Sequence, residues 1–138
     1  MSRKSARELI FKLVFEHSFQ SEIEYQTLYA DLQNNEEENI DITAEDDEFI
    51  TSMVEGIEKN QSSIDEKIKA HLKDWNFERL SQIDIAILRV SIYEICYRED
   101  IPDKVSVNEA IELAKMFSDE TSPKFINGVL AEIIKDKE

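Results

Sequence analysis

Two aromatic residues and two lysines gather around one short segment near the C-terminal end of this 138-residue chain. Phe117 closes one amphipathic stretch and Phe125 opens the next, with Lys115 and Lys124 beside them. The Ser-Pro pair at 122–123 is typical of a helix start, where unpaired backbone N–H groups attract anions. Aromatic faces, lysines and helix N–H groups together suit single-stranded nucleic acid. The same residues also fit a plain helix junction with core phenylalanines and solvated lysines, so both interpretations stay open.

The remaining residues offer little for catalysis. His17 and His71 belong to no metal-binding spacing, and no phosphate-binding loop, dinucleotide fingerprint or nucleophile elbow occurs. Cys96 is the single cysteine, which excludes an intramolecular disulfide and fits a reducing cytoplasm. The N-terminus lacks the apolar core of a signal peptide, and no apolar run is long enough to span a membrane. We therefore predict a cytoplasmic protein with no catalytic residue, no metal and no cofactor.

Composition favours a single all-α domain over residues 1–138. Apolar residues make up 41% and charged residues 34%, while two Gly and two Pro leave little material for β turns. The net charge is −15, and residues 21–60 alone carry thirteen acidic residues against one lysine. This acidic quarter is either a solvated face or a surface that attracts a basic partner.

Helical periodicity predicts the elements that position the junction. Residues 5–20 and 23–33 are expected to form the first two helices, and Thr43 to cap a third. A further helix is expected to open at Ser63 and run through Trp75. Gly56 interrupts the apolar face of the third helix, which indicates a close approach by another helix.

One helix, "LSQIDIAILRVSIYEICYRED", is apolar in nearly every direction and is expected at the centre of a bundle. Its polar residues share a narrow strip: Asp84, Ser91, Glu94 and Arg98. Arg89 falls outside the strip, so it needs a carboxylate or carbonyl partner inside the protein.

The last predicted helix contains an unusual pair of residues. Asn127 and Gly128 lie within the apolar pattern of "SPKFINGVLAEII", although Gly weakens a helix. We expect Gly128 to let a neighbouring backbone approach. We expect Asn127 to project near the unpaired N–H groups at the helix start, which could bind an anion.

Four stretches resemble the NusB family of bacterial transcription antitermination factors: "ARELIFKLVFE", "IDIAILRVSIYEI", "VSVNEAIELAKMF" and "SPKFINGVL". The resemblance covers nearly the whole chain. It implies about seven helices in two small antiparallel bundles, without catalysis. It also implies a NusE-type ribosomal small-subunit protein as partner, boxA RNA as the ligand of the heterodimer, and an indirect link to the RNA polymerase elongation complex. A homodimer is an alternative state without the partner.

The resemblance extends to individual residues. It implies RNA contacts at Arg3, Lys4, Arg7 and His71, at Phe117 and Phe125, and in the loop between them with Ser118, Ser122 and Lys124. The residues of the junction themselves add Lys115 and Asn127 as candidates. It implies a partner contact at Asp84, on the polar strip, which is expected to be exposed. Ser91 and Glu94 of the same strip are therefore also expected to contact the partner. Because the chain is so acidic, we expect its RNA affinity to depend on a cationic partner.

Two other functions remain open from sequence. The chain resembles the N-terminal RNA-recognition domain of a ribosomal RNA cytosine methyltransferase, an enzyme that would continue into a domain with a cofactor loop and a catalytic Cys. It also fits a helical interaction module without any RNA role.

Overall fold

The computed structural model describes residues 1–35, 41–73 and 76–138. This part of the chain contains six α-helices, one short 3₁₀ helix and no strand, so the predicted all-α class is confirmed with one α-helix fewer than expected. The helices are α1 (Arg3–His17), α2 (Tyr25–Gln33), α3 (Ala44–Ala70), η1 (Phe77–Arg79), α4 (Gln82–Tyr97), α5 (Asp103–Phe117) and α6 (Ser122–Lys137). None of the described helices is long and apolar enough to cross a membrane.

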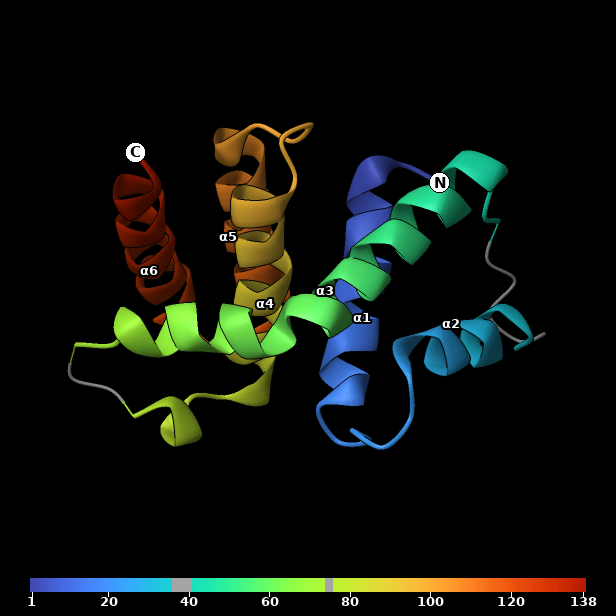
Figure 1. Cartoon of the computed structure of the whole chain (residues 1–138), viewed down its shortest axis with the longest axis horizontal. Coiled ribbons are helices and arrows are strands. Elements are labelled where there is room, and N and C mark those ends of the chain that lie inside the picture. The colour runs from blue at the N-terminus through green and yellow to red at the C-terminus, as the bar shows by residue number, and fades with distance from the viewer. Residues whose placement is uncertain (36–40, 74–75) are drawn as a thin grey trace.

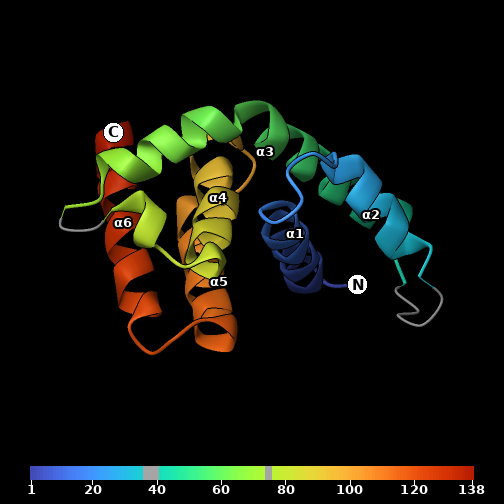
Figure 2. The same cartoon turned by 90° about the horizontal axis from the view of Figure 1, so that it is seen from below.

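Helix α4 lies at the centre and packs against α1, α3, α5 and α6. Figure 1 shows α4, α5 and α6 side by side at one end of the molecule and α1 and α2 at the other, with α3 running across both groups. In Figure 2, turned by 90°, α3 arches over the two groups. Every α4 residue from Asp84 to Ile95 is buried, which confirms the central position predicted from its apolar surroundings.

A buried ion pair joins α1 to α4. The Arg7 Nε donates to Oε2 of Glu94 over 2.7 Å, and the Ser106 hydroxyl of α5 donates to Oε1 over 2.8 Å. The Glu94 side chain is fully buried, and the Arg7 side chain is 5% exposed. Both carboxylate oxygens therefore have partners, which offsets the cost of removing the charge from water.

A second ion pair joins α4 to α3. The Arg89 guanidinium donates from Nε and Nη2 to the two carboxylate oxygens of Asp65, each over 2.9 Å. The prediction that Arg89 needs a partner inside the protein is confirmed. The paired planar groups fix the rotation of α4 against the C-terminal part of α3.

The expected helix start at Ser63 is wrong, because α3 continues through it to Ala70. Ile57, Ile64 and Ile68 are fully buried and extend one apolar face along the helix, so nothing interrupts it at Ser63. The predicted start at Thr43 is confirmed by a capping box with Asp46. Trp75 lies outside the described residues.

The two glycines differ in their surroundings. A Cβ on Gly56 would lie 1.8 Å from the hydroxyl oxygen of Tyr93 in α4, so the predicted close approach at Gly56 is confirmed. A Cβ on Gly128 would meet no atom of the described residues within 4 Å, so the expected approach of a neighbouring backbone there is wrong for this part of the chain. Gly128 therefore costs α6 about 1 kcal/mol relative to Ala with no packing gain inside the chain.

We expect the change Arg7→Ala to lower the free energy of unfolding by about 3–5 kcal/mol, because Glu94 would stay buried without its cation. Urea unfolding followed by circular dichroism measures this loss. Arg3→Ala is the control in the same helix, since the Arg3 side chain is 49% exposed and its pair with Glu45 is 3.9 Å long. Arg3→Ala should cost about 1 kcal/mol or less. Equal losses for the two variants would contradict the assignment.

Candidate nucleic-acid and partner interface

The turn between α5 and α6 is held by Asp84, at the start of α4. The hydroxyls of Ser118 and Ser122 donate to Oδ1 and Oδ2 of Asp84 over 2.7 and 3.0 Å. The backbone N–H of Asp84 donates to the hydroxyl oxygen of Ser81, the N-cap residue of α4, over 3.0 Å. Asp84 is 8% exposed and Ser122 is 2% exposed. The carboxylate therefore fixes the loop from inside.

The two aromatic residues of the junction lie on opposite sides of this turn. The Phe117 ring packs 5.2 Å from the ring of Phe11, and the Lys12 ammonium lies 5.7 Å from its centroid. Phe125 is half-buried at the start of α6 and lines two surface hollows of about 260 and 380 Å³. Arg79 contributes to the smaller hollow. The structure thus brings aromatic faces and cations together at the junction.

The N-terminus of α6 is less suited to binding an anion than the sequence suggests. Pro123 has no N–H, and the N–H groups of Ser122 and Phe125 donate to backbone oxygens of Asp119 and Thr121. The exposed Asp119 carboxylate also accepts from the Thr121 hydroxyl over 3.0 Å, and it shares the single hydroxyl proton of Ser122 with Asp84, likewise over 3.0 Å. These hydrogen bonds lower the pKa of Asp119, so a negative charge stands beside this helix end at neutral pH.

His71 caps the end of α3 and connects it to α6. Its Nδ1 lies 2.7 Å from the backbone oxygen of Lys67, and its Nε2 lies 2.6 Å from Oδ2 of Asp136. Both partners are acceptors, so the two contacts favour an imidazole that carries a proton on each ring nitrogen. Burial lowers the pKa of His71, but these hydrogen bonds and the charges of Asp136 and Glu132 outweigh it and raise the pKa above 6.5.

Five residues predicted to face RNA or a partner are buried in the structure: Arg7, Asp84, Ser91, Glu94 and Ser122. Asp84 and Ser122 hold the turn between α5 and α6, as described above. Arg7 and Glu94 form the buried pair described above, and the Ser91 hydroxyl donates to the Ile87 carbonyl of its own helix over 2.8 Å. Contacts with a partner would require an exposed strip, but Asp84, Ser91 and Glu94 of α4 are all buried. Arg7, Ser91 and Glu94 are therefore corrected to structural residues.

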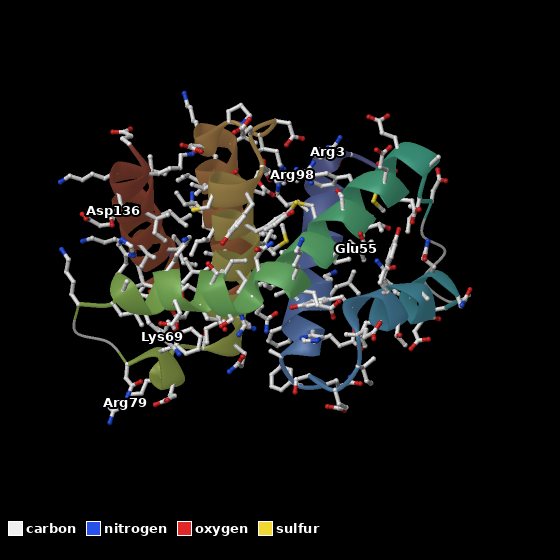
Figure 3. All side chains as sticks on the ribbon, viewed as in Figure 1. Arg3, Glu55, Lys69, Arg79, Arg98 and Asp136 are labelled. Atoms are coloured by element: carbon white, nitrogen blue, oxygen red, sulfur yellow. The ribbon has the colours of Figure 1, made fainter. Side chains whose placement is uncertain are left out.

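The N-terminal cations lie apart from the junction. Arg3 and Arg98 both stack over the ring of Phe49, at 3.8 and 5.6 Å, and Figure 3 shows the two arginines near each other. Arg98 follows the C-terminal end of α4, whereas Asp84 is in its first turn, about 20 Å away along the helix. Arg3 and the exposed Lys4 are thus not brought together with Phe117 and Phe125.

Of the other predicted residues, Lys115 is exposed and lies 3.9 Å from Glu112 of its own helix. Lys124 and Asn127 are also exposed, on the first two turns of α6. Cys96 is half-buried, and burial raises the pKa of its thiol, which disfavours the reactive thiolate. In the described part of the chain, no group of three or more potential ligands could hold a metal ion.

Sequence reasoning missed an aromatic ladder on α1 and the loop that follows it. The rings of Phe11 and Phe15 are 6.3 Å apart, and those of Phe15 and Phe19 are 5.1 Å apart. Phe19 is 64% exposed, and Met116, next to Phe117, is 57% exposed. The spacing of four residues between the three phenylalanines could have revealed this row. It forms an apolar surface beside the junction.

The helical fold, with aromatic rings and cations gathered around one helix junction, is that of an all-α binding protein. Residues 4–135 match the family model of the NusB family. Transcription antitermination protein NusB of Clostridium novyi (strain NT) is 47% identical over 98% of this chain and 99% of its own length. That of Acetivibrio thermocellus is 42% identical over 99% of this chain and 91% of its own. The chain therefore belongs to the NusB family.

Solved structures agree. The structure of T. maritima NusB has a TM-score of 0.87 and 34% identity, and the match covers 99% of this chain and 92% of that one. A structure described as antitermination factors NusB and NusE in complex with dsRNA has a TM-score of 0.85 and 25% identity, covering 97% and 96%. These relatives favour antitermination over the methyltransferase domain considered from sequence.

We expect His71 to make stability depend on pH. Because its folded pKa is raised, its contribution should be fully present below the unfolded value of about 6.5 and should fade as pH rises through the folded pKa. Urea unfolding of the wild type and His71→Gln from pH 5.5 to 9 measures the difference. Asp136→Asn should flatten the difference, since it removes the charge that favours the imidazolium. A stability difference that stays constant or grows with pH would contradict this assignment.

Proposed function

We propose that this protein is a transcription antitermination factor. It binds a NusE-type ribosomal small-subunit protein, and the heterodimer binds boxA RNA in nascent ribosomal RNA transcripts. The complex then supports processive elongation by RNA polymerase, which implies a cytoplasmic location. The observation that carries the proposal is the match over nearly the whole chain to the NusB of the NusB–NusE–dsRNA structure. The role is recognition, without a catalytic step.

Charge explains why a partner is needed. The chain carries a net charge of −15, and phosphate neutralisation supplies much of the affinity of proteins for nucleic acid. The ionised Asp119 carboxylate adds local repulsion at the loop between α5 and α6. A cationic partner that docks beside this loop would supply the missing positive charge. In this account the chain contributes aromatic and lysine contacts, and the partner contributes electrostatic attraction.

The RNA-facing residues that we retain are those around the junction. Phe117 and Phe125 offer partly exposed rings for stacking, and Lys115, Lys124 and Asn127 are exposed beside them. Asp84 acts through Ser118 and Ser122, since it holds the loop that separates the two rings. His71 borders the larger hollow next to Phe125. Arg3 and Lys4 would contact a different section of the RNA.

The partner surface that we propose is the aromatic ladder beside the junction. Phe19 and Met116 are two of the few large apolar side chains left exposed in the described residues. Phe11 and Phe15 connect Phe19 to Phe117, so a partner on the ladder would lie close to RNA held at the junction. An aromatic centre within a polar surface is the usual composition of a protein interface.

RNA binding with and without the partner tests the function. Fluorescence anisotropy at physiological salt should compare boxA RNA with a scrambled RNA of equal length. We expect the heterodimer to bind boxA tightly and selectively, and this protein alone to bind it weakly. Equal boxA affinities for the isolated protein and the heterodimer would contradict the composite site. A heterodimer that does not prefer boxA to the scrambled RNA would contradict the proposed function.

The change Phe19→Ser tests the partner surface. Because Phe19 is exposed, the variant should keep wild-type stability, whereas partner affinity should fall by about tenfold or more if the ring is a central contact. Isothermal titration with the NusE-type partner measures the affinity. Val105→Ser is the matched control, since Val105 is 39% exposed near the opposite end of α5. Unchanged affinity for Phe19→Ser, or an equal loss for Val105→Ser, would contradict the aromatic ladder as the partner surface.

A further inference from the structure

A surface hollow of about 430 Å³ lies between the second half of α3, the end of α4 and the last turns of α6. Cys96, Tyr97 and Lys137 are among the residues that line it, and we call it the Cys96 hollow. Figure 1 shows the second half of α3 passing across α4 and α6. Asp136, which also lines the hollow, lies about 16 Å along α6 from Phe125. The hollow is therefore separate from the junction, and its volume falls in the range of about 300–1,000 Å³ for small-molecule sites.

Two lysines line the Cys96 hollow from opposite helices. Lys67 of α3 is half-buried, and its ammonium group forms no hydrogen bond or ion pair with another residue of the described ranges. The Nζ of Lys137 donates to the Ile95 carbonyl over 2.9 Å and to Oδ1 of Asp103 over 2.8 Å, which leaves one of its three N–H groups. Burial raises the pKa of the Cys96 thiol, whereas the charges of Lys67 and Lys137 act in the opposite direction. Both ammonium groups therefore act on the same end of the hollow.

The lysine charges are met only in part. Asp136 is the one carboxylate among the lining residues, and it is already bound to His71 over 2.6 Å. Asp103 is paired with Lys137, whereas Lys67 has no such partner in the described part of the chain. On a chain of net charge −15, this local excess of positive charge favours an anionic ligand.

An aromatic wall completes the hollow. The ring centroids of Tyr93 and Tyr97 are 5.5 Å apart and the ring planes differ by 15°, while the Tyr97 hydroxyl lies 2.9 Å from the Ser63 hydroxyl. These two contacts fix the Tyr97 ring, which is still 36% exposed, and Ile133 adds a second apolar side chain. A fixed ring beside two ammonium groups suits a flat ligand that carries its negative charge at one end.

A phosphate monoester carries a charge of about −1.5 to −2 at neutral pH, which matches two ammonium groups. We propose that the Cys96 hollow binds a free nucleoside monophosphate, with its phosphate between Lys67 and Lys137 and its base against Tyr97. The site requires neither RNA nor a protein partner, so it goes beyond the function proposed above. The end of an RNA chain carries the same groups, and RNA competition distinguishes the two sources.

Isothermal titration of the isolated protein with AMP and GMP tests the site at physiological salt. Both should bind, whereas adenosine and inorganic phosphate, which each carry half of the ligand, should bind about tenfold more weakly or less. Lys67→Gln should weaken AMP binding about tenfold or more, as for one lost charge-assisted hydrogen bond. Lys69→Gln is the matched control in the same helix, since Lys69 is 50% exposed and does not line the hollow. It should change AMP affinity by less than about twofold, because salt screens exposed charges.

Alkylation of Cys96 by iodoacetamide gives an independent measurement on the wild-type protein, because Cys96 is the single cysteine of the chain. AMP at ten times its Kd should slow alkylation about tenfold, since only the free fraction of the protein reacts. The same AMP concentration should protect Lys67→Gln much less. Intact mass spectrometry measures the rate, and circular dichroism checks that the variants are folded.

Several results would overturn the proposal. These are no binding of AMP or GMP, equal AMP affinity for wild type and Lys67→Gln, and an equal loss for Lys69→Gln. Phosphate that binds as tightly as AMP would remove the ring contact. BoxA RNA that protects Cys96 in the heterodimer beyond the protection by the partner alone would assign the hollow to RNA. None of these results affects the antitermination function, which fails only if the heterodimer does not bind boxA selectively.

Discussion

The fold depends on one buried carboxylate, which needs hydrogen-bond donors and a positive charge beside it. Glu94 lies at the centre of the molecule with no exposed surface, and its charge is met by Arg7 from α1 and Ser106 from α5. An unpaired charge in that position would cost several kcal/mol, so three helices must meet there. The contact of these three helices fixes the position of α1 against α4 and α5, and it places the Phe11 ring beside the Phe117 ring. The position of one candidate binding residue is thus set by an ion pair in the interior.

The same kind of contact shapes the binding surface. Asp84 is almost as buried as Glu94, and its carboxylate accepts from two serine hydroxyls of the turn between α5 and α6. Polar residues that sequence reasoning assigns to partners are therefore used to hold the surface in shape. What remains for ligands is a set of rings and lysines around a fixed turn. A preformed site of this kind loses less conformational entropy on binding.

Periodicity and composition predicted the all-α class and most of the helices, although not the unbroken α3, whereas the partners of the polar residues were not predictable. The apolar surroundings of α4 predicted its central position, and Arg89 was expected to have a partner that proved to be Asp65. Exposure of Glu94 was predicted wrongly because Arg7, its partner, is 87 residues away in sequence and a helical wheel contains no neighbouring helices. The site was predicted in part, since the two rings and Lys124 lie at the junction. The larger hollow next to Phe125, which Gly128 also lines, depends on residues at the end of α3 as well. No local sequence pattern connects α3 to α6.

RNA is expected to bind at the junction and at the larger hollow next to Phe125, and not at the acidic end of the molecule formed by α2 and the start of α3. Nuclear magnetic resonance of the isotope-labelled protein, bound to unlabelled NusE-type partner and titrated with boxA RNA, tests this most directly. The account predicts that amide shifts change at Lys73, Lys124, Phe125 and Gly128, while those of Arg7 and Glu94 stay in place. Changes confined to α2 and the first half of α3, with the junction unaffected, would contradict it.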